Sequence, residues 1–171
     1  PQINSGEIAF GTSNTFESTF ARNGTGNFEG RPLENLRLVT ALMPFQVSIM
    51  VRRDSGIDSF DDLKGQPFPD GYSSQRLVGV MQDAIFAGVG LSVADLEPVP
   101  VPNFVKGAEL LGEGKVAGVL LAPGSGVVAQ TDAKTPVRFL GIPGGEATEA
   151  KIAALLPASY LTEVAPSPRM P

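Results

Sequence analysis

Three polar junctions in the sequence carry residue types that could bind a small anion. Each junction follows an apolar run that is expected to form a strand and precedes a segment that is expected to begin a helix. The junctions are residues 11–14, 70–76 and 122–126. Amide groups in the first turn of a helix have no acceptor within the helix, so they can donate to a carboxylate. Neighbouring hydroxyl groups could add further hydrogen bonds.

These junctions supply most of the candidate ligand-binding residues. Arg76 is expected in the first turn of a helix, where a guanidinium could hold a carboxylate in bidentate fashion; the alternative is a solvated surface arginine. Tyr72 could stack on a ligand or donate its hydroxyl group, and Phe45 could wall the site. For any single junction, the alternative is that Ser and Thr simply cap helices. The full predicted set is Thr12, Ser13, Asn14, Phe45, Tyr72, Ser73, Ser74, Arg76, Pro123, Gly124 and Ser125.

The composition argues against several classes of function. The 171 residues include no Cys and no His, which rules out disulfides, thiolate catalysis, Cys-based zinc sites and a Ser-His-Asp triad. No obvious pair of carboxylates is present for acid–base catalysis, so we expect a protein that is not an enzyme. The net charge of -5 argues against non-specific binding of nucleic acid, which needs clustered Lys and Arg.

Two further patterns bear on metals and cofactors. The aspartates between positions 54 and 62 could suggest calcium, but their spacing does not match an EF-hand loop and Asp62 has an expected capping role. The Gly-rich segments 24–26 and 141–145 lack the order of a P-loop or of a dinucleotide-binding fingerprint. We therefore predict neither a metal nor a cofactor.

The hydrophobic periodicity predicts strands and helices that alternate over residues 47–142. This alternation favours βαβ units and an α/β fold, with a mostly parallel sheet and helices on both of its faces. Ligands bind such sheets at the carboxyl ends of the strands. The expected strands include residues 7–11, 36–42, 47–52, 116–122 and 137–142. The clearest expected helices are residues 74–88 and 146–156, with others beginning near residues 12, 104 and 127.

The order of motifs after residue 47 resembles a known family. A strand leads to VRRDSGI (residues 51–57) and DLKG (62–65), and a second strand then precedes a Ser-rich helix start. This order resembles type II periplasmic solute-binding proteins, and within them the TAXI family of TRAP-transporter receptors. Residues 6–11 (GEIAFG) and 135–140 (TPVRFL) are similar to other elements of that family. The DGYSS loop (70–74) departs from its usual Gly-rich loop.

The resemblance implies a type II periplasmic-binding-protein-like fold with one complete lobe and part of a second. Residues 1–52 and 136–171 would form the partial first lobe with the inter-lobe strands, and residues 53–135 the second lobe. The implied function is an extracytoplasmic receptor that captures a small organic anion, a carboxylate or an amino acid, between two lobes. The implied partner is the membrane permease of a TRAP-type secondary importer.

The resemblance also bears on the location and the completeness of the chain. Residues 1–4 do not resemble a signal peptide, so the sequence suggests either a mature or trimmed form or a cytoplasmic protein. The resemblance implies the periplasmic location, which we expect. The opening and closing segments of the family have no counterpart, which suggests truncation at both ends. An incomplete first lobe would expose Ile8, Phe10, Leu38 and Leu42, and could thereby cause self-association. The alternatives are an effector-binding or sensory domain of similar fold, and a truncated fragment without binding activity.

Overall fold

The computed structural model describes residues 2–165, which fall into two units. Unit 1 comprises residues 2–45 with residues 156–159, and unit 2 comprises residues 46–155 with residues 160–165. The lobe boundaries at residues 52 and 136 stay a prediction, and their outermost residues, 1 and 166–171, lie outside the described part of the chain.

Unit 1 is built around one α-helix, α1 (Thr15–Asn23), followed by a 3₁₀ turn, η1 (Gly26–Phe28). The side chain of Asn14 caps α1 by accepting a hydrogen bond of 2.8 Å from the amide of Glu17. The helix ends at Gly24, whose φ of 67° lies in the left-handed region that glycine adopts without steric strain. The helix expected to begin near residue 12 is therefore confirmed, three residues later.

The strands expected at residues 7–11 and 36–42 of unit 1 are not formed. Residues 7–9 form bends, and residues 37–45 make no backbone–backbone hydrogen bond within the described part of the chain. A strand needs a neighbour to satisfy its amides and carbonyls, and an apolar pattern alone does not provide one. As a result, apolar side chains are open to solvent: Phe10 is 74% exposed and Leu38 is 87% exposed.

Unit 2 contains a three-stranded sheet in the order β4-β1-β5 and a two-stranded sheet of β2 and β3. The strands are β1 (Ser48–Arg52), β2 (Pro67–Asp70), β3 (Glu97–Pro100), β4 (Gly118–Leu121) and β5 (Val137–Phe139). β2 and β3 are parallel, whereas β1 is antiparallel to both of its neighbours. The expectation of mostly parallel pairing is therefore wrong for β1. Its neighbours lie far away in sequence, and periodicity carries no information about strand direction.

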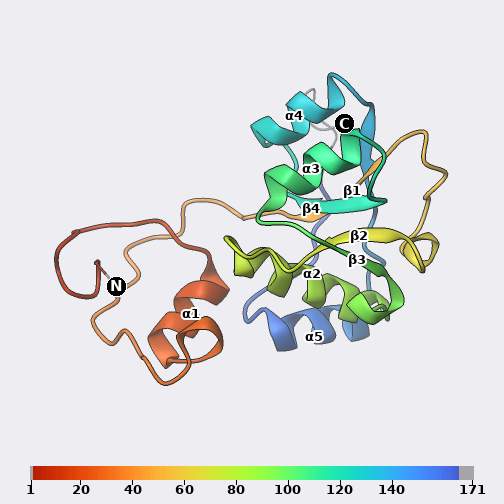
Figure 1. The fold of residues 1–171 in the computed structure, drawn as a ribbon. Helices are drawn as coiled ribbons and strands as arrows, with labels where there is room; N and C mark the ends of the chain where they lie inside the picture. Colours follow the sequence, from red (N-terminus) through yellow and green to blue (C-terminus); the bar gives the residue numbers. More distant parts are fainter. Residues whose placement is uncertain (1, 166–171) are drawn as a thin grey trace. The chain divides into compact units, whose positions relative to one another are not determined.

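A backbone hydrogen bond connects the two sheets. Ala117, which immediately precedes β4, donates its amide to the carbonyl oxygen of Pro67 at the start of β2, at 2.8 Å. Both strands therefore begin at the same edge, and β3 runs parallel to β2 in register. The carboxyl ends of β2, β3 and β4 consequently lie at one edge (Figure 1).

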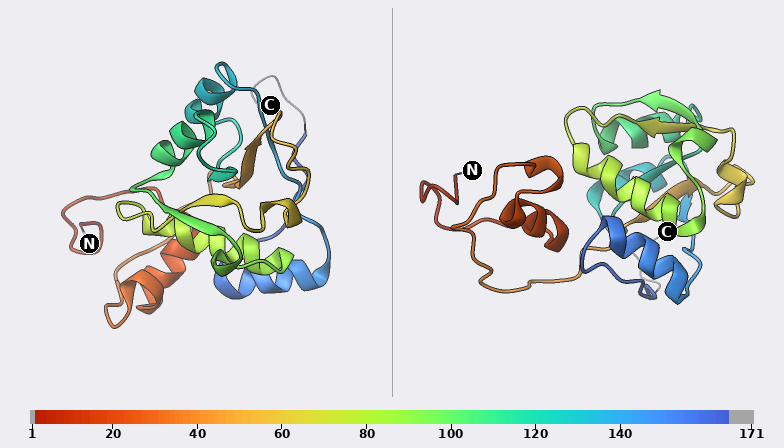
Figure 2. Two further views of the ribbon diagram at one scale, coloured as in Figure 1. Left: turned by 45° about the vertical axis from the view of Figure 1, so that its right-hand side comes forward. Right: turned by 90° about the horizontal axis from the view of Figure 1, so that it is seen from below.

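Helices cover both faces of the strands in unit 2 (Figures 1 and 2). α3 (Phe104–Gly112) and α4 (Gly126–Asp132) lie on one face, and α2 (Arg76–Val89) and α5 (Glu146–Leu155) lie on the other. This arrangement confirms the α/β class. The core between the sheet and α3 contains Met50, Ala108, Leu111, Val116, Val119, Leu121, Val128 and Val137.

Two 3₁₀ turns follow the capping pattern of the sequence. They are η2 (Asp61–Leu63) and η3 (Val93–Asp95). Asp62 accepts hydrogen bonds from the amide and the hydroxyl group of Ser59, both at 2.8 Å. Ser92 opens a complete capping box at η3, as its spacing from Asp95 predicts.

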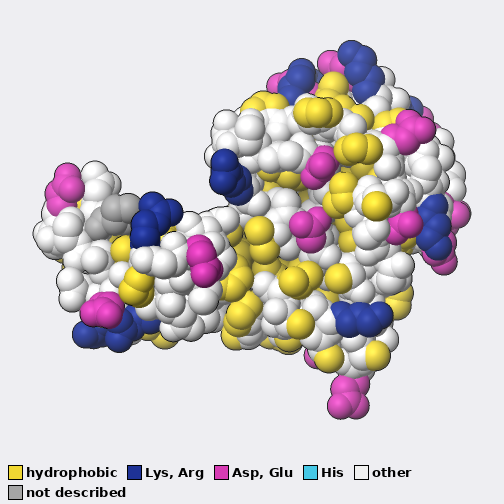
Figure 3. Space-filling model, turned by 60° about the horizontal axis from the view of Figure 1, so that its bottom comes forward, with side chains coloured by type: hydrophobic (Ala, Val, Ile, Leu, Met, Phe, Trp, Pro, Cys, Tyr) yellow, Lys and Arg dark blue, Asp and Glu magenta, His cyan; other side chains and the backbone are white. Residues whose placement is uncertain are grey.

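The surface carries charged side chains of both signs with apolar side chains between them (Figure 3). None of the helices within residues 2–165 has the length and the apolar composition that crossing a membrane requires.

Candidate functional site

Three loops of unit 2 leave the common carboxyl edge of β2, β3 and β4. They are residues 71–75, 101–103 and 122–125, and they lead into α2, α3 and α4 respectively. The sequence predicts the first and third loops but not the second. The Pro-rich residues 98–102, which lead into the second loop, indicate only an extended run. Asn103 was the available signal, since its side chain caps α3 by accepting a hydrogen bond of 3.0 Å from the amide of Lys106.

The first two loops are hydrogen-bonded to each other. The amides of Ser73 and Ser74 donate to the carbonyls of residues 101 and 102, at 3.3 and 2.9 Å. The side-chain oxygen of Gln75 accepts a hydrogen bond of 3.2 Å from the amide of Phe104, the first residue of α3. The amides of Ser73 and Ser74 are therefore engaged within the protein, and the groups they leave for a ligand are their hydroxyls.

The donors of the turn formed by residues 73–76 suit an anion. The side chains of Ser73, Ser74 and Arg76 are exposed. Within residues 2–165, Arg76 forms no ion pair, and the amides of Arg76 and Leu77 have no hydrogen-bond acceptor. The 14-residue helix α2 adds the partial positive charge of its N-terminus at this point. The position predicted for Arg76, in the first turn of a helix, is confirmed.

Tyr72 lies in the core, in contrast to its predicted role as a ligand contact. Its side chain is fully buried, and its hydroxyl group donates a hydrogen bond of 2.9 Å to the side-chain oxygen of Gln82. Burial raises the pKa of the Tyr72 hydroxyl, and the nearby charge of Asp70 raises it further. The ring is buried because a large apolar surface is stabilised away from water once the hydroxyl has a partner.

The third loop has a structural role at its capping residue. Ser125 is the N-cap of α4, and its hydroxyl oxygen accepts a hydrogen bond of 3.4 Å from the amide of Val128. Gly124 has a φ of 78°, which favours glycine, and Pro123 is half-buried. The capping interpretation therefore accounts for Ser125, and its contribution to a ligand site stays a prediction.

The remaining predicted residues belong to unit 1. Asn14 is engaged as the N-cap of α1, and the hydroxyl group of Ser13 lies 3.4 Å from a carboxylate oxygen of Glu17. Thr12 is exposed, and Phe45 is 57% exposed. Their contribution to a common site with the loops of unit 2 stays a prediction.

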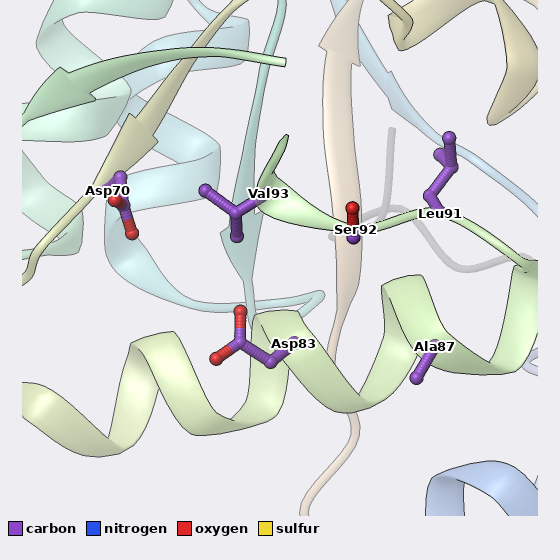
Figure 4. A pocket seen from close by; sticks show the side chains of 6 residues that line it. All are labelled: Asp70, Asp83, Ala87, Leu91, Ser92 and Val93. Atoms are coloured by element: carbon purple, nitrogen blue, oxygen red, sulfur yellow. The ribbon is translucent and has the colours of Figure 1, made fainter. Parts of the chain in front are cut away.

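A separate pocket of about 420 Å³ opens beside α2 (Figure 4). Two carboxylates, those of Asp70 and Asp83, face this space. Partial burial raises the pKa of the Asp83 carboxyl, and the charge of Asp70 raises it further. Two acidic groups on one pocket disfavour a carboxylate ligand, so this pocket differs in chemistry from the 73–76 turn. Its lining residues are Asp70, Asp83, Ala87, Leu91, Ser92 and Val93.

Several solved structures are similar to this chain. The periplasmic sulfonate-binding protein SsuA from Methylobacillus flagellatus KT is 22% identical, with a TM-score of 0.46, over 56% of this chain and 27% of that one. The L-cystine solute receptor of Neisseria gonorrhoeae is 15% identical, with a TM-score of 0.38, over 64% and 48% of the two chains. XAC2383 from Xanthomonas citri is 16% identical, with a TM-score of 0.42, over 82% and 66%. This chain thus spans only about a quarter to a half of the first two proteins.

The assignment to TAXI receptors stays a prediction. The comparison with protein families matches residues 1–165, nearly the whole sequence, to one family. The chain therefore belongs to the NMT1-like family.

Proposed function

We propose that this protein is an extracytoplasmic solute-binding receptor for a small carboxylate-bearing solute or an amino acid. The observation that carries the proposal is the turn at residues 73–76. It combines two exposed hydroxyls, an arginine without an ion pair in the described residues, and first-turn amides without acceptors, all at the carboxyl edge of the strands. The resemblance of residues 51–57 and 62–65 to TAXI receptors supports a periplasmic location and a TRAP-type permease as the partner.

The proposed chemistry is non-covalent recognition of an anion. The guanidinium of Arg76 holds one carboxylate through two parallel hydrogen bonds, and the amides at the start of α2 donate to the same group. The hydroxyls of Ser73 and Ser74 complete the donor set. A charge-assisted hydrogen bond of this kind contributes about 1.5–3 kcal/mol. The permease then distinguishes the receptor with bound solute from the empty receptor by the conformation that the solute stabilises.

The first experiment is native mass spectrometry of the protein as purified, followed by the intact mass after denaturation. We expect a small additional mass that is lost on denaturation, and its value identifies the solute. A wild-type protein that retains only its own 17.8 kDa, and that binds no carboxylate or amino acid in subsequent calorimetry, contradicts the proposal.

The role of Arg76 is tested by calorimetry with the solute identified in this way. Arg76→Ala is expected to weaken binding about tenfold to a hundredfold, because one charge-assisted contact is removed. The folded state should be preserved, since the Arg76 side chain is exposed. Lys151→Ala on α5 is the matched control, because it removes an exposed cation elsewhere in unit 2. Equal affinities for the two variants would exclude Arg76 as a contact.

A further inference from the structure

Gln82 forms a buried polar network directly behind the 73–76 turn. Among the buried residues of the described part of the chain, it is the one with an amide or charged side chain, and it has no exposed area. Its oxygen accepts the hydrogen bond from the Tyr72 hydroxyl at 2.9 Å, and its amide group donates to the carbonyl oxygen of Pro69 at 3.1 Å. One side chain on α2 therefore joins the end of β2 to the residue that opens the turn.

Tyr72 has an unusual backbone conformation that this network helps to hold. Its φ of 34° is positive, in a region that bulky residues rarely adopt and that persists only where the surroundings enforce it. The buried ring and the hydrogen bond to Gln82 provide such enforcement, while Gly71 supplies a second left-handed residue with a φ of 80°. The direction in which the chain leaves β2 is consequently set by the contacts of Tyr72.

The opposite side of the turn is fixed as well. The amides of Ser73 and Ser74 donate to residues 101 and 102, and Gln75 accepts from Phe104. The turn is thus held by α2 on one side and by the loop before α3 on the other. A site that is already ordered in the folded protein loses little conformational entropy when a ligand binds. This smaller loss increases the affinity.

We propose that Gln82 is a positioning residue for the proposed anion site. It touches no solute, but it holds Tyr72 so that the Ser73 and Ser74 hydroxyls and the first amides of α2 are presented together. This inference rests on the proposed function. It adds that binding depends on a fully buried amide side chain behind the turn.

The test compares amide spectra of the full chain by ¹H–¹⁵N NMR, with L-glutamate as the probe anion. Gln82→Met keeps a side chain of similar length without its hydrogen bonds, and Tyr72→Phe removes only the hydroxyl. Both variants are expected to move the amide resonances of residues 73–76 and to weaken glutamate binding about tenfold, with cooperative unfolding retained. Gln130→Met, at an exposed position on α4, is the control and should match the wild type in both measurements.

Gln82→Glu gives a signature that a loss of packing alone would not produce. A carboxyl at this fully buried position has a raised pKa, because burial disfavours its charged form. When protonated, this side chain can accept from Tyr72 and donate to Pro69, as glutamine does; when ionised, it can only accept. The resonances of residues 73–76 in Gln82→Glu should therefore approach the wild-type positions as the pH falls. The wild type, recorded over the same pH range, is the control for pH effects that do not involve residue 82.

The two proposals fail in distinguishable ways. If the wild-type amides of Arg76 and Leu77 do not respond to glutamate or to the solute found by mass spectrometry, the proposed function fails. The spectra of the variants without any anion still test whether Gln82 positions the turn. Resonances of residues 73–76 that stay unchanged in Gln82→Met and Tyr72→Phe, or an unchanged affinity in both, overturn the inference even where the wild type binds.

Discussion

Single polar residues at the helix starts of this protein fall into two groups. Asn14, Asn103 and Ser125 each accept a hydrogen bond from an amide in the first turn of the following helix. Ser73 and Ser74 do not, because the N-cap of α2 is Gln75, and no side-chain capping bond is formed there. The capping interpretation therefore accounts for the first group, and the hydroxyls of the second group support the proposed site.

Asp62 gives a prediction about stability and pH. Hydrogen bonds from the Ser59 hydroxyl and from backbone amides hold the pKa of the Asp62 carboxyl below its ordinary value of 3.8. Because the pKa is lower in the folded state, this contribution to stability is complete above pH 3.8 and is lost as the pH falls through the depressed value. We expect the urea midpoint of Asp62→Asn to fall less steeply on acidification than that of the wild type.

The comparison needs urea titrations at several pH values between 6 and 2. Asp54, Asp95 and Glu113 also have lowered pKa values, so the wild type and the variant should both lose stability in acid. Glu163→Gln, at an exposed position, is the control and should keep the wild-type slope. Identical slopes for Asp62→Asn and the wild type would show that these hydrogen bonds do not contribute.

At the level of elements, the packing of α2 against α5 depends on one glycine. A Cβ atom built at Gly88 would lie 2.7 Å from Cγ1 of Ile152, a buried residue of α5. The same substitution at Gly79, also within α2, would meet only the ring of Tyr72, at 3.7 Å. Alanine substitutions at the two glycines therefore make the same change in helix propensity but a different change in packing.

We expect the two alanine variants to change the free energy of unfolding in opposite directions. Alanine favours a helix interior over glycine by about 1 kcal/mol, so Gly79→Ala should stabilise the protein by up to that amount. Overpacking typically costs about 1–3 kcal/mol, so Gly88→Ala should be destabilising by about 1 kcal/mol net. Urea denaturation of both variants measures the difference. Equal stabilisation by both would mean that α5 moves away from α2 at no cost.

The exposed apolar segment 38–45 favours association of this protein with other chains. Leu38, Val39, Leu42 and Met43 are each more than two thirds exposed, at 87%, 74%, 71% and 79%. The same segment has unpaired backbone groups within the described residues, and an extended apolar segment of this kind can pair with another chain. These observations support the self-association that the sequence suggested.

Light scattering over a range of protein concentrations measures this association. We expect the mean mass to rise above 17.8 kDa with concentration, and the double variant Leu38→Glu with Leu42→Glu to stay closer to the monomer. Leu155→Glu is the control, because Leu155 is exposed at 43% but lies outside the segment. A wild-type protein that remains monomeric at all concentrations would show that the segment does not mediate association.

Features that depend on short-range signals follow from the amino-acid sequence alone. The helical periodicity of residues 74–88 predicted α2, the apolar run of residues 116–122 predicted the buried strand β4, and the spacing of Ser92 predicted its capping box. The placement of Arg76 in the first turn of α2 follows from the same local patterns. Each of these signals is complete within a few residues, so distant parts of the chain do not alter it.

Features that depend on distant contacts become visible in the folded chain and not in local sequence patterns. The antiparallel pairing of β1 depends on partners about 70 and 90 residues away, and the unpaired apolar segment of unit 1 lacks partners that its pattern alone suggests. The sequence predicts Tyr72 as a ligand contact. In the structure, Gln82 on the following helix provides a buried partner for its hydroxyl group. Local propensity describes which secondary structure a residue favours. Its burial and its strand pairing depend on which other residues the fold brings next to it.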